Sequence, residues 1–454
     1  MENIQDYTVL FLVWVISFFV VRFILSKSKS SYKLPSSPFR LPIIRHLHLL
    51  RPIPHQALHN LSRCYGPLLY LSFGSFPCVV ASSPETAKEF VKTHETSFSN
   101  RPSTVAIRCL TYGEADFSFA PYGRYWKLFM KKICMTELLG GRTLDHFLPG
   151  TLWKSQANEA VDVGQELTAL ANNIISRMTI SRRCSATSEE ASEVRTLVDE
   201  VGGLSGKFNF QDYIWFCKNV DIQGLGKAFE HEEARNKNCD SSMRSKDLVS
   251  ILLDIMKDEK AEMRLSRESI EAFILEMFTT GTGTSAGVIQ WALAELINHP
   301  DILNKGREET DSTTGNKRLK TLRLHPSGPL FTRESTQHCK IGGYDIPAST
   351  RLIVNVWSIG RDPNYWENPM DFVPTRFING TLPFGSGRRS CPWTSLALRV
   401  IQTTLVGLIQ CFDWKVANGK ENSVDMTEAA GIALLMAQPL VCVPVARDIP
   451  FLTI

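Results

Sequence analysis

The chain has 454 residues, of which 43% are hydrophobic and 21% charged, so it can bury a core of ordinary globular composition. Its net charge of +4 is too small to indicate a nucleic-acid partner, and no basic stripe interleaved with aromatic residues is present. The eleven cysteines form no C-x-x-C pair and no zinc-spaced cluster with histidine, and an odd number cannot form a complete disulfide framework. We expect most of them to be small buried residues in a reducing compartment.

The first segment predicts a membrane anchor. Residues 7–25 read YTVLFLVWVISFFVVRFIL, nineteen residues with a single charge. At about 1.5 Å per residue they nearly match a hydrocarbon core roughly 30 Å thick. Basic residues follow, which places the body on the cytosolic side by the positive-inside rule; a cleaved signal peptide is the alternative, but no small-residue cleavage site follows. We therefore predict an anchor at 1–25, a linker and proline-rich hinge at 26–42, and a body at 43–454.

The body is predicted to be mainly helical with a minor β-sheet region. Alternating β-branched and aromatic residues predict a hairpin at 70–82. Most of 120–310 has apolar residues at helical spacing. Short strands are expected late in the chain, at 340–346, 350–354 and 440–445.

The longest predicted helix covers 267–298, with Ser266 as its N-cap and Pro300 just past its end. It is apolar nearly all round, so we expect it to be buried. Its middle reads TTGTGTS, which is poor helix sequence. Two interpretations stay open: a close helix crossing over small residues, or a local opening of the backbone hydrogen bonds where a ligand meets the helix.

One cysteine differs from the others in its surroundings. Cys391 ends the stretch FGSGRRSC, behind a glycine-rich, doubly basic turn and ahead of a helix-like run. A thiolate, the form that binds metals or acts as a nucleophile, needs positive charge or N–H donors nearby. Arg388, Arg389 and the start of the next helix are expected to supply both. The glycines let the backbone approach a flat ligand closely.

This stretch resembles the heme-thiolate motif of the cytochrome P-450 monooxygenases. The resemblance covers essentially the whole chain, including GRYWK at 123–127, LRLHPSGPLFTRES at 322–335 and NVWSIGRDPNYWENPMDFVPTRF at 355–377. Stretches such as PCVVAS, THETSFSNRP and DFSFAPYG look like the plant branch that includes flavone synthases and the hydroxylases of isoflavonoids and pterocarpans.

The resemblance implies the cytochrome P-450 fold with heme b, whose iron would be held axially by the Cys391 thiolate. Thr284, on the long helix, would be the catalytic hydroxyl that helps deliver protons to dioxygen. Arg323 and Arg376 would belong to a buried charge network under the heme. Arginine and tryptophan donors suit the anionic propionates of heme. The heme-binding residues that the resemblance implies are Trp126, Lys131, Arg333, Phe384, Arg389 and Cys391.

The implied activity is the NADPH- and O2-dependent hydroxylation or desaturation of a flavonoid, isoflavonoid or pterocarpan-like substrate, a small apolar or phenolic molecule. The implied partners are an NADPH-dependent reductase and membrane lipid, with no nucleic acid. The implied location is the endoplasmic reticulum membrane, crossed once, with the catalytic domain facing the cytosol.

The chain departs from the family pattern where chemistry is expected. A glutamate should lie three residues before Arg323, but Lys320 stands there, and like charges repel when buried. Gly283 replaces the acid that precedes Thr284, which removes the carboxylate partner of a proton relay. Trp393 replaces a glycine two residues after the cysteine, where we expect an indole to clash with the porphyrin or push the helix away.

Other departures shorten or shift the chain. Lys131 falls five residues after Trp126 where four are expected, and Thr375 replaces an acid. The region around 224–237, the approach to Pro326 and the link before the cysteine loop look shortened.

The alternative to an active monooxygenase is therefore a catalytically impaired pseudoenzyme of the same family, or a defective gene model. A hydrolase is excluded because FGSGR is not a G-x-S-x-G elbow and no triad is visible.

Overall fold

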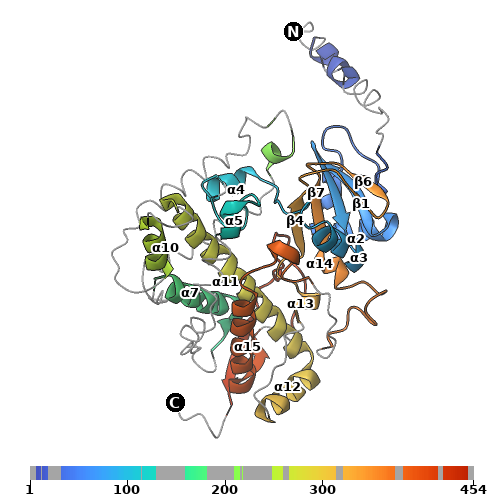
Figure 1. Cartoon of the computed structure of the whole chain (residues 1–454). Coiled ribbons are helices and arrows are strands. Elements are labelled where there is room, and N and C mark those ends of the chain that lie inside the picture. Colours follow the sequence, from blue (N-terminus) through green and yellow to red (C-terminus); the bar gives the residue numbers. More distant parts are fainter. Residues whose placement is uncertain are drawn as a thin grey trace.

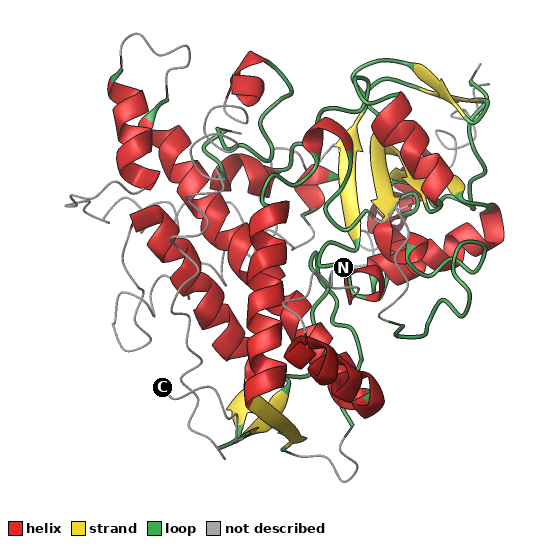
Figure 2. Ribbon diagram, turned by 60° about the horizontal axis from the view of Figure 1, so that its bottom comes forward, coloured by secondary structure: helices red, strands yellow, loops and turns green. Residues whose placement is uncertain are grey.

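The fold is mainly helical with small sheets, as predicted (Figures 1 and 2). Figure 1 shows the larger sheet on one side of the molecule and the long helices on the other. The computed structural model describes residues 7–11, 13–18, 32–113, 115–128, 159–180, 209–214, 217, 248–258, 265–312, 321–373, 382–417 and 423–447.

The larger sheet has the strand order β1-β2-β7-β4. Strands β1 (Leu68–Phe73) and β2 (Phe76–Ala81) form the predicted antiparallel hairpin, which turns at Gly74 with φ +55°. Strand β7 (Arg351–Asn355) pairs parallel to β2 and antiparallel to β4 (Leu330–Glu334). The strands are rich in Val, Leu and Ile, and their buried side chains hold the sheet against the helices around it.

Short helices cover this sheet. Helix α2 (Pro54–Tyr65) packs on β1 and β7 and contacts α14 (Val356–Ile359). Helix α3 (Pro84–Lys88) begins with Pro84 at its first position, and Ser83 closes a capping box with Thr86. The strand predicted at 340–346 is instead a hairpin of β5 (Cys339–Ile341) and β6 (Tyr344–Ile346), because Gly342 and Gly343 both adopt positive φ and turn the chain.

The helical part is built around α11 (Arg267–Asn298), which has the predicted bounds and the predicted Ser266 N-cap. It packs against α7 (Val163–Ile180) and α15 (Thr394–Cys411). Helix α10 (Leu248–Lys257) also contacts α7 and α11, and α12 (Pro300–Ser312) follows α11. The buried core cluster of this part includes Leu293, Ala292 and Ile401.

The glycine-rich middle of α11 is a close helix crossing. The helix continues through TTGTGTS without a break. A Cβ on Gly281 would lie 2.9 Å from Cδ1 of Ile175 on α7, so the two helices approach closely at this glycine. Beside it, Thr282 Oγ1 donates to Asn172 Oδ1 at 2.8 Å. Of the two interpretations left open by the sequence, the structure supports the crossing of small residues, and no local opening of α11 is seen.

A third sheet lies at the far end of α15. It consists of β3 (Val161–Asp162), β9 (Val441–Ala446) and β8 (Phe412–Val416), and β9 is the strand predicted near the C-terminus. The remaining short elements are η1 (Leu47–Leu50), η2 (Glu89–Thr93), α4 (Val105–Leu110), α5 (Arg124–Leu128), η4 (Phe210–Asp212), α13 (Thr321–Leu324) and η6 (Gly387–Arg389).

The described residues do not test the predicted membrane anchor. An apolar helix of 7–18, with residue 12 undescribed, stands apart from the body in Figure 1, but this described part is too short to span a bilayer. Among the described residues, α15 is the one helix of spanning length and composition, and it packs against α11 and β8 within the body. The anchor and the division of the chain into three parts stay predictions.

Candidate functional site

Cys391 lies in a loop whose shape depends on two glycines. Its backbone N–H donates to the carbonyl of Phe384 at 2.8 Å, which closes the loop just before α15. Gly385 and Gly387 have φ values of +72° and +73°, which side chains rarely allow. A Cβ on Gly387 would also lie 2.5 Å from the carbonyl oxygen of Val91. The glycine-rich turn therefore presents the thiol through a backbone that other residues could not adopt.

Burial raises the pKa of the Cys391 thiol above its ordinary value. Hydrogen bonds from the Trp393 backbone and the Thr394 side chain, and the charge of Arg101, act in the opposite direction but do not overcome it. A thiolate here needs a further positive partner. A metal ion supplies that charge and displaces the thiol proton when it binds.

The arginine next to this loop that we expected to support the thiolate is used elsewhere. Arg388 is exposed, and its Nε lies 3.2 Å from Oε2 of Glu95 in an ion pair. Its Nη1 donates to the hydroxyl of Tyr122 at 2.6 Å. These contacts fasten the cysteine loop to the segment that follows η2. The expectation that Arg388 stabilises the thiolate is therefore not supported by its contacts, and the arginine that acts on Cys391 is Arg101.

Arg389 is buried and forms its hydrogen bonds with other residues. Its Nε donates to the Ser99 carbonyl at 2.9 Å, and its two Nη atoms donate to the carbonyls of Ser118 and Ala120. Its guanidinium stacks on the ring of Trp126 at 4.5 Å. Burial, and then the charge of a neighbouring arginine, lower the pKa of Arg389 to about 10.

Arg389 belongs to a group of three arginines, which we call the arginine cluster: Arg101, Arg333 and Arg389. Arg333 on β4 is buried, and it donates to the carbonyls of Thr332 at 3.0 Å and of Arg389 at 3.1 Å. Burial, then the charges of Arg101 and Arg389, hold the pKa of Arg333 well below its ordinary value. The Nε of Arg101 is buried, and no described residue forms a hydrogen bond with it. The cluster is positive, buried and incompletely satisfied, which is the electrostatic condition for binding an anion.

Two acids lie beside the cluster. Glu276, on α11, is buried, and its carboxyl accepts hydrogen bonds from the backbone of Phe117 at 3.2 Å and from the backbone and hydroxyl of Ser118. Burial, and then the charge of Asp116, raise the pKa of Glu276 to about 8. The raised pKa favours the protonated, neutral form of Glu276. Asp116, whose charge acts to raise the pKa of Arg101 and Arg389, therefore balances part of the positive charge of the cluster.

Sequence reasoning missed Arg101, Asp116 and Glu276. A signal for Glu276 was present, because it is an acid inside the otherwise apolar run FILEMF of a helix expected to be buried. Arg101 gave no such signal, since its neighbours are polar, and only the fold brings it beside Cys391.

The indole donor of Trp126, a residue predicted to bind heme, is engaged within the chain. The indole is buried, and its Nε1–H donates to the Phe117 carbonyl at 3.0 Å. Trp126 therefore positions the Arg389 guanidinium above its ring and braces the 115–120 segment. Phe384 is partly buried and packs against the core around α11 and α15.

Thr284 has a hydroxyl that bonds along its own helix. Its Oγ1 donates to the Thr280 carbonyl at 2.6 Å, and Thr280 Oγ1 donates to the Glu276 carbonyl at 2.7 Å. The preceding Gly283 faces open space, because a Cβ built there meets no atom within 4 Å. The position lacks an acid although the structure leaves room for one.

Trp393 lies in an apolar slot between helices. Its ring stacks on Phe273 of α11, with ring centroids 6.3 Å apart. It also packs against the cluster formed by Ile174 and Met178 of α7 and Leu396 of α15. The predicted conflict between this indole and a porphyrin stays a prediction.

Arg323, on the single-turn helix α13, is held mainly by backbone carbonyls. Its Nη1 donates to Gly360 at 2.8 Å and to Pro369 at 2.6 Å, and its Nη2 donates to Asp371 at 2.8 Å. Its guanidinium also lies 5.0 Å from the ring centre of Trp366. The sequence predictions for Lys131, Lys320, Thr375 and Arg376 fall outside the described residues.

Comparison with known proteins gives the family. Residues 35–443 match the family model described as Cytochrome P450. Cytochrome P450 93A3 of Glycine max is 50% identical over 94% of this chain and 95% of its own length. Two further Glycine max proteins are a 3,9-dihydroxypterocarpan 6A-monooxygenase, 46% identical over 98% of this chain and 99% of its own, and a beta-amyrin 24-hydroxylase, 42% identical over 99% and 100%.

The alignments also bear on the shortened segments. The alignment with Cytochrome P450 93A3 runs over 488 positions, more than the 454 residues of this chain, so that relative has residues that this chain lacks.

The fold is also that of solved cytochrome P450 structures. A zebrafish cytochrome P450 solved with abiraterone matches with a TM-score of 0.73 at 22% identity, covering 87% of this chain and all of that one. With this fold, the cysteine loop and the family match in hand, the chain belongs to the cytochrome P450 family of monooxygenases, oxidoreductases that hold heme iron through a cysteine thiolate.

Proposed function

We propose that this chain oxidises a flavonoid, isoflavonoid or pterocarpan-like substrate, with Cys391 as the ligand of the heme iron. The observation that carries the assignment of the site is the arginine cluster beside Cys391. The substrate class rests on the relatives, one of which is a dihydroxypterocarpan monooxygenase.

The residues of the site fit a heme on its anionic side. The two propionates of heme are carboxylates, and Arg333, Arg389 and Arg101 offer buried guanidiniums that mutually repel without an anion. Phe384 and the glycine turn would hold the loop, and Trp126 would orient Arg389. When bound, heme supplies the activation of dioxygen, and its positive iron would stabilise the Cys391 thiolate against burial.

The site lacks the acid expected to supply protons to Thr284. A hydroxyl at Thr284 can pass a proton only if an acid resupplies it, and Gly283 supplies none. We therefore propose slow turnover, which agrees with the alternative of a catalytically impaired enzyme.

Because the space beside Gly283 is open, Gly283→Asp should fold normally and increase turnover. Gly283→Ala is the matched control, because it adds a Cβ at the same position without a carboxyl group. Equal turnover before and after Gly283→Asp would remove proton supply as the limiting step.

The first test is the absorption spectrum of the reduced, carbon-monoxide-bound protein. We expect the red-shifted Soret band of a thiolate ligand, lost in Cys391→Ser and kept in Cys411→Ser, a control near the other end of α15. A band at the non-thiolate position in the unmodified protein would exclude Cys391 as the ligand.

The substrate class is tested with a panel of flavanones, isoflavonoids, pterocarpans and the triterpenoid beta-amyrin. We expect turnover with a phenolic member, supported by an NADPH-dependent reductase. Turnover of beta-amyrin alone would move the proposal to triterpenoids, which a relative's name also permits.

We also propose that the chain is anchored in the endoplasmic reticulum membrane by its N-terminal apolar segment, with the body in the cytosol. Support comes from the apolar run at 7–25 and the exposed side chains of Phe11 and Trp14. Release of the full chain from membranes by alkaline carbonate would contradict the anchor.

A further inference from the structure

Trp393 breaks a local rule of helix formation. It occupies the N-cap position of α15, two residues after Cys391, with φ −79° and ψ 6°, and its side chain forms no capping hydrogen bond. Serine, threonine, aspartate, asparagine and glycine are favoured at this position, and large apolar residues are not. A local conflict of this kind is expected where tertiary contacts or function compensate for it.

The compensating contacts of Trp393 are apolar, and they join two core clusters. The Trp393 ring stacks on Phe273 of α11 with an angle of 30° between the ring planes. It packs against the core cluster that contains Phe273 and Trp126. It also packs against the cluster that contains Met178 of α7 and Leu396 of α15. The indole therefore connects the start of α15 to both α11 and α7.

The cysteine loop is attached on its other side by a polar residue. Arg389, two residues before Cys391, donates its hydrogen bonds to backbone carbonyls of the 99–120 segment. Trp393, two residues after Cys391, packs on α11 and α7. The two attachments meet at Trp126, because the Arg389 guanidinium lies 4.5 Å from its ring and Trp393 packs against the same cluster. The thiol thus lies midway between a polar and an apolar attachment.

A loop of this composition depends on its attachments. Gly385 and Gly387 both adopt positive φ, and glycine loses more conformational freedom on folding than any other residue. The backbone of Trp393 also forms a hydrogen bond with the Cys391 sulfur. Movement of Trp393 would therefore change the surroundings of the sulfur directly.

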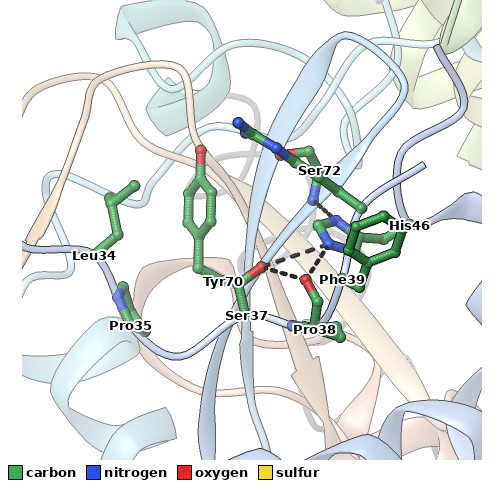
Figure 3. A pocket seen from close by; sticks show the side chains of 9 residues that line it. Leu34, Pro35, Ser37, Pro38, Phe39, His46, Tyr70 and Ser72 are labelled. Atoms are coloured by element: carbon green, nitrogen blue, oxygen red, sulfur yellow. Dashed lines mark hydrogen bonds between the residues drawn. The ribbon is translucent and has the colours of Figure 1, made fainter. Parts of the chain in front are cut away.

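The proline-rich hinge offers a comparison, because polar contacts hold it in place. Beside the cavity in Figure 3, Nδ1 of His46 accepts the Ser72 N–H at 2.8 Å, and Nε2 donates to the Pro38 carbonyl at 3.1 Å. These hydrogen bonds tie the hinge to β1 in the sheet part of the molecule. Removal of this ring should loosen a turn and lower stability, so His46→Ala is a control for changes near Cys391.

We propose that Trp393 is a positioning residue, whose indole, stacked on Phe273, holds the end of the cysteine loop against α11 and fixes the Cys391 sulfur as a metal ligand. The proposal rests on the proposed function, in which Cys391 binds the heme iron. Metal ligands are held in place by the residues that support them, and loss of that support weakens the site. The role is the opposite of the conflict expected from the sequence, in which the same indole would obstruct the porphyrin.

The test follows the reduced, carbon-monoxide-bound spectrum of the heme-loaded full chain over time, at a temperature at which circular dichroism shows every variant to be folded. In Trp393→Gly, the thiolate-type band should convert to the non-thiolate band about two- to tenfold faster, the range that an aromatic pair contributes. Glycine is accepted at an N-cap, so this change removes the indole without weakening the start of α15. Trp393→Phe, which keeps a ring against Phe273, should convert at nearly the unmodified rate.

Two further variants separate positioning of the sulfur from general stability. Phe273→Leu removes the stacking partner on α11 and leaves the sequence of the cysteine loop unchanged. It should also speed the conversion, by no more than Trp393→Gly does. His46→Ala should lower the free energy of unfolding and leave the conversion rate unchanged.

The possible outcomes lead to different conclusions. Conversion of Trp393→Gly at the unmodified rate would overturn the positioning role, and so would equal acceleration in His46→Ala. Slower conversion in Trp393→Gly would also overturn it and would show that the indole obstructs the cofactor. A non-thiolate band in the unmodified protein from the start would overturn Cys391 as the ligand, and the positioning role with it.

Discussion

Two buried groups of charged side chains differ in how their charges are balanced. In the first, Glu428 lies 2.8 Å from His55 and 3.5 Å from Arg361, and the Trp357 indole donates to it at 2.7 Å. Burial alone would raise the pKa of Glu428, but these hydrogen bonds and the charge of Arg361 lower it to about 2. The second is the arginine cluster, where three guanidiniums lie near Asp116 and Glu276, and burial raises the pKa of Glu276 to about 8.

The difference in charge balance suggests a structural role for the first group and a binding role for the second. The Glu428 group contains both signs of charge, and its hydrogen bonds tie α2, α14 and the C-terminal segment together. Buried N–H groups without a hydrogen-bond partner among the described residues occur in both groups, on Arg361 in the first and on Arg101 in the second. What distinguishes the arginine cluster is its excess of positive charge, which an anion would balance. An unbalanced buried charge is thus a better pointer to a binding site than a paired one.

The largest expected effect on stability comes from removing the negative charge of Glu428 from the first group. Glu428→Gln should lower the free energy of unfolding by about 3–5 kcal/mol, because it leaves Arg361 buried without a counter-charge. The measurement is urea-induced unfolding of the heme-free protein. Asp425→Asn, on an exposed turn of the same segment, should change little. An unchanged unfolding midpoint for Glu428→Gln would show that the first group is not structural.

The same carboxylate should make the fold sensitive to acid. The pKa of Glu428 in the folded chain is about 2, below the ordinary 4.5. Its contribution to the free energy of unfolding is therefore complete above pH 4.5 and is lost as pH falls toward 2. The unmodified protein should lose this stability over that window, whereas Glu428→Gln should not.

Glu276 should show the opposite pH dependence. Its folded pKa of about 8 lies above the ordinary 4.5, so ionising Glu276 costs more in the folded chain than in the unfolded chain. The contribution of Glu276 to the free energy of unfolding is therefore fully present below pH 4.5 and is lost as pH rises to 8. Glu276→Gln should therefore be more stable than the unmodified chain at pH 8, by up to a few kcal/mol, with the gap closing toward pH 4.5. Glu271→Gln, a partly exposed acid on the same helix, is the control. Parallel stability curves for the variant and the unmodified chain would mean that Glu276 is ionised in the folded state.

The smallest effect on unfolding is expected in the arginine cluster itself. Arg333→Gln should change the free energy of unfolding of the heme-free protein by no more than about 1 kcal/mol, because lost hydrogen bonds are offset by reduced repulsion. The same variant should release heme at least tenfold faster to an apo-globin acceptor. Arg307→Gln, which breaks an ion pair of 2.7 Å with Asp413, should destabilise the fold and leave heme release unchanged. Heme release from Arg333→Gln at the unmodified rate would remove the cluster from the propionate site.

Much of the fold follows from local pattern. The β1–β2 hairpin and α11 could be predicted because side-chain periodicity, turn glycines and caps are local signals. The β5–β6 hairpin was predicted as one strand because two adjacent glycines resemble a flexible strand until their φ angles are known. The family, the cysteine loop and its glycines were also readable in order along the chain.

The sequence by itself determined the helical class, the family and the cysteine loop, because these depend on residues close together in the chain. Only the tertiary structure decided which charges meet. Arg101, Arg333 and Arg389 are separated by more than fifty residues at each step. The family resemblance singled out Arg333 and Arg389, but nothing local shows that the three side chains meet. Arg388 and Arg389 are neighbours, yet one pairs with Glu95 at the surface and the other is buried. Electrostatic interactions act through space and depend on burial, so the site's charge balance exists only in the folded chain.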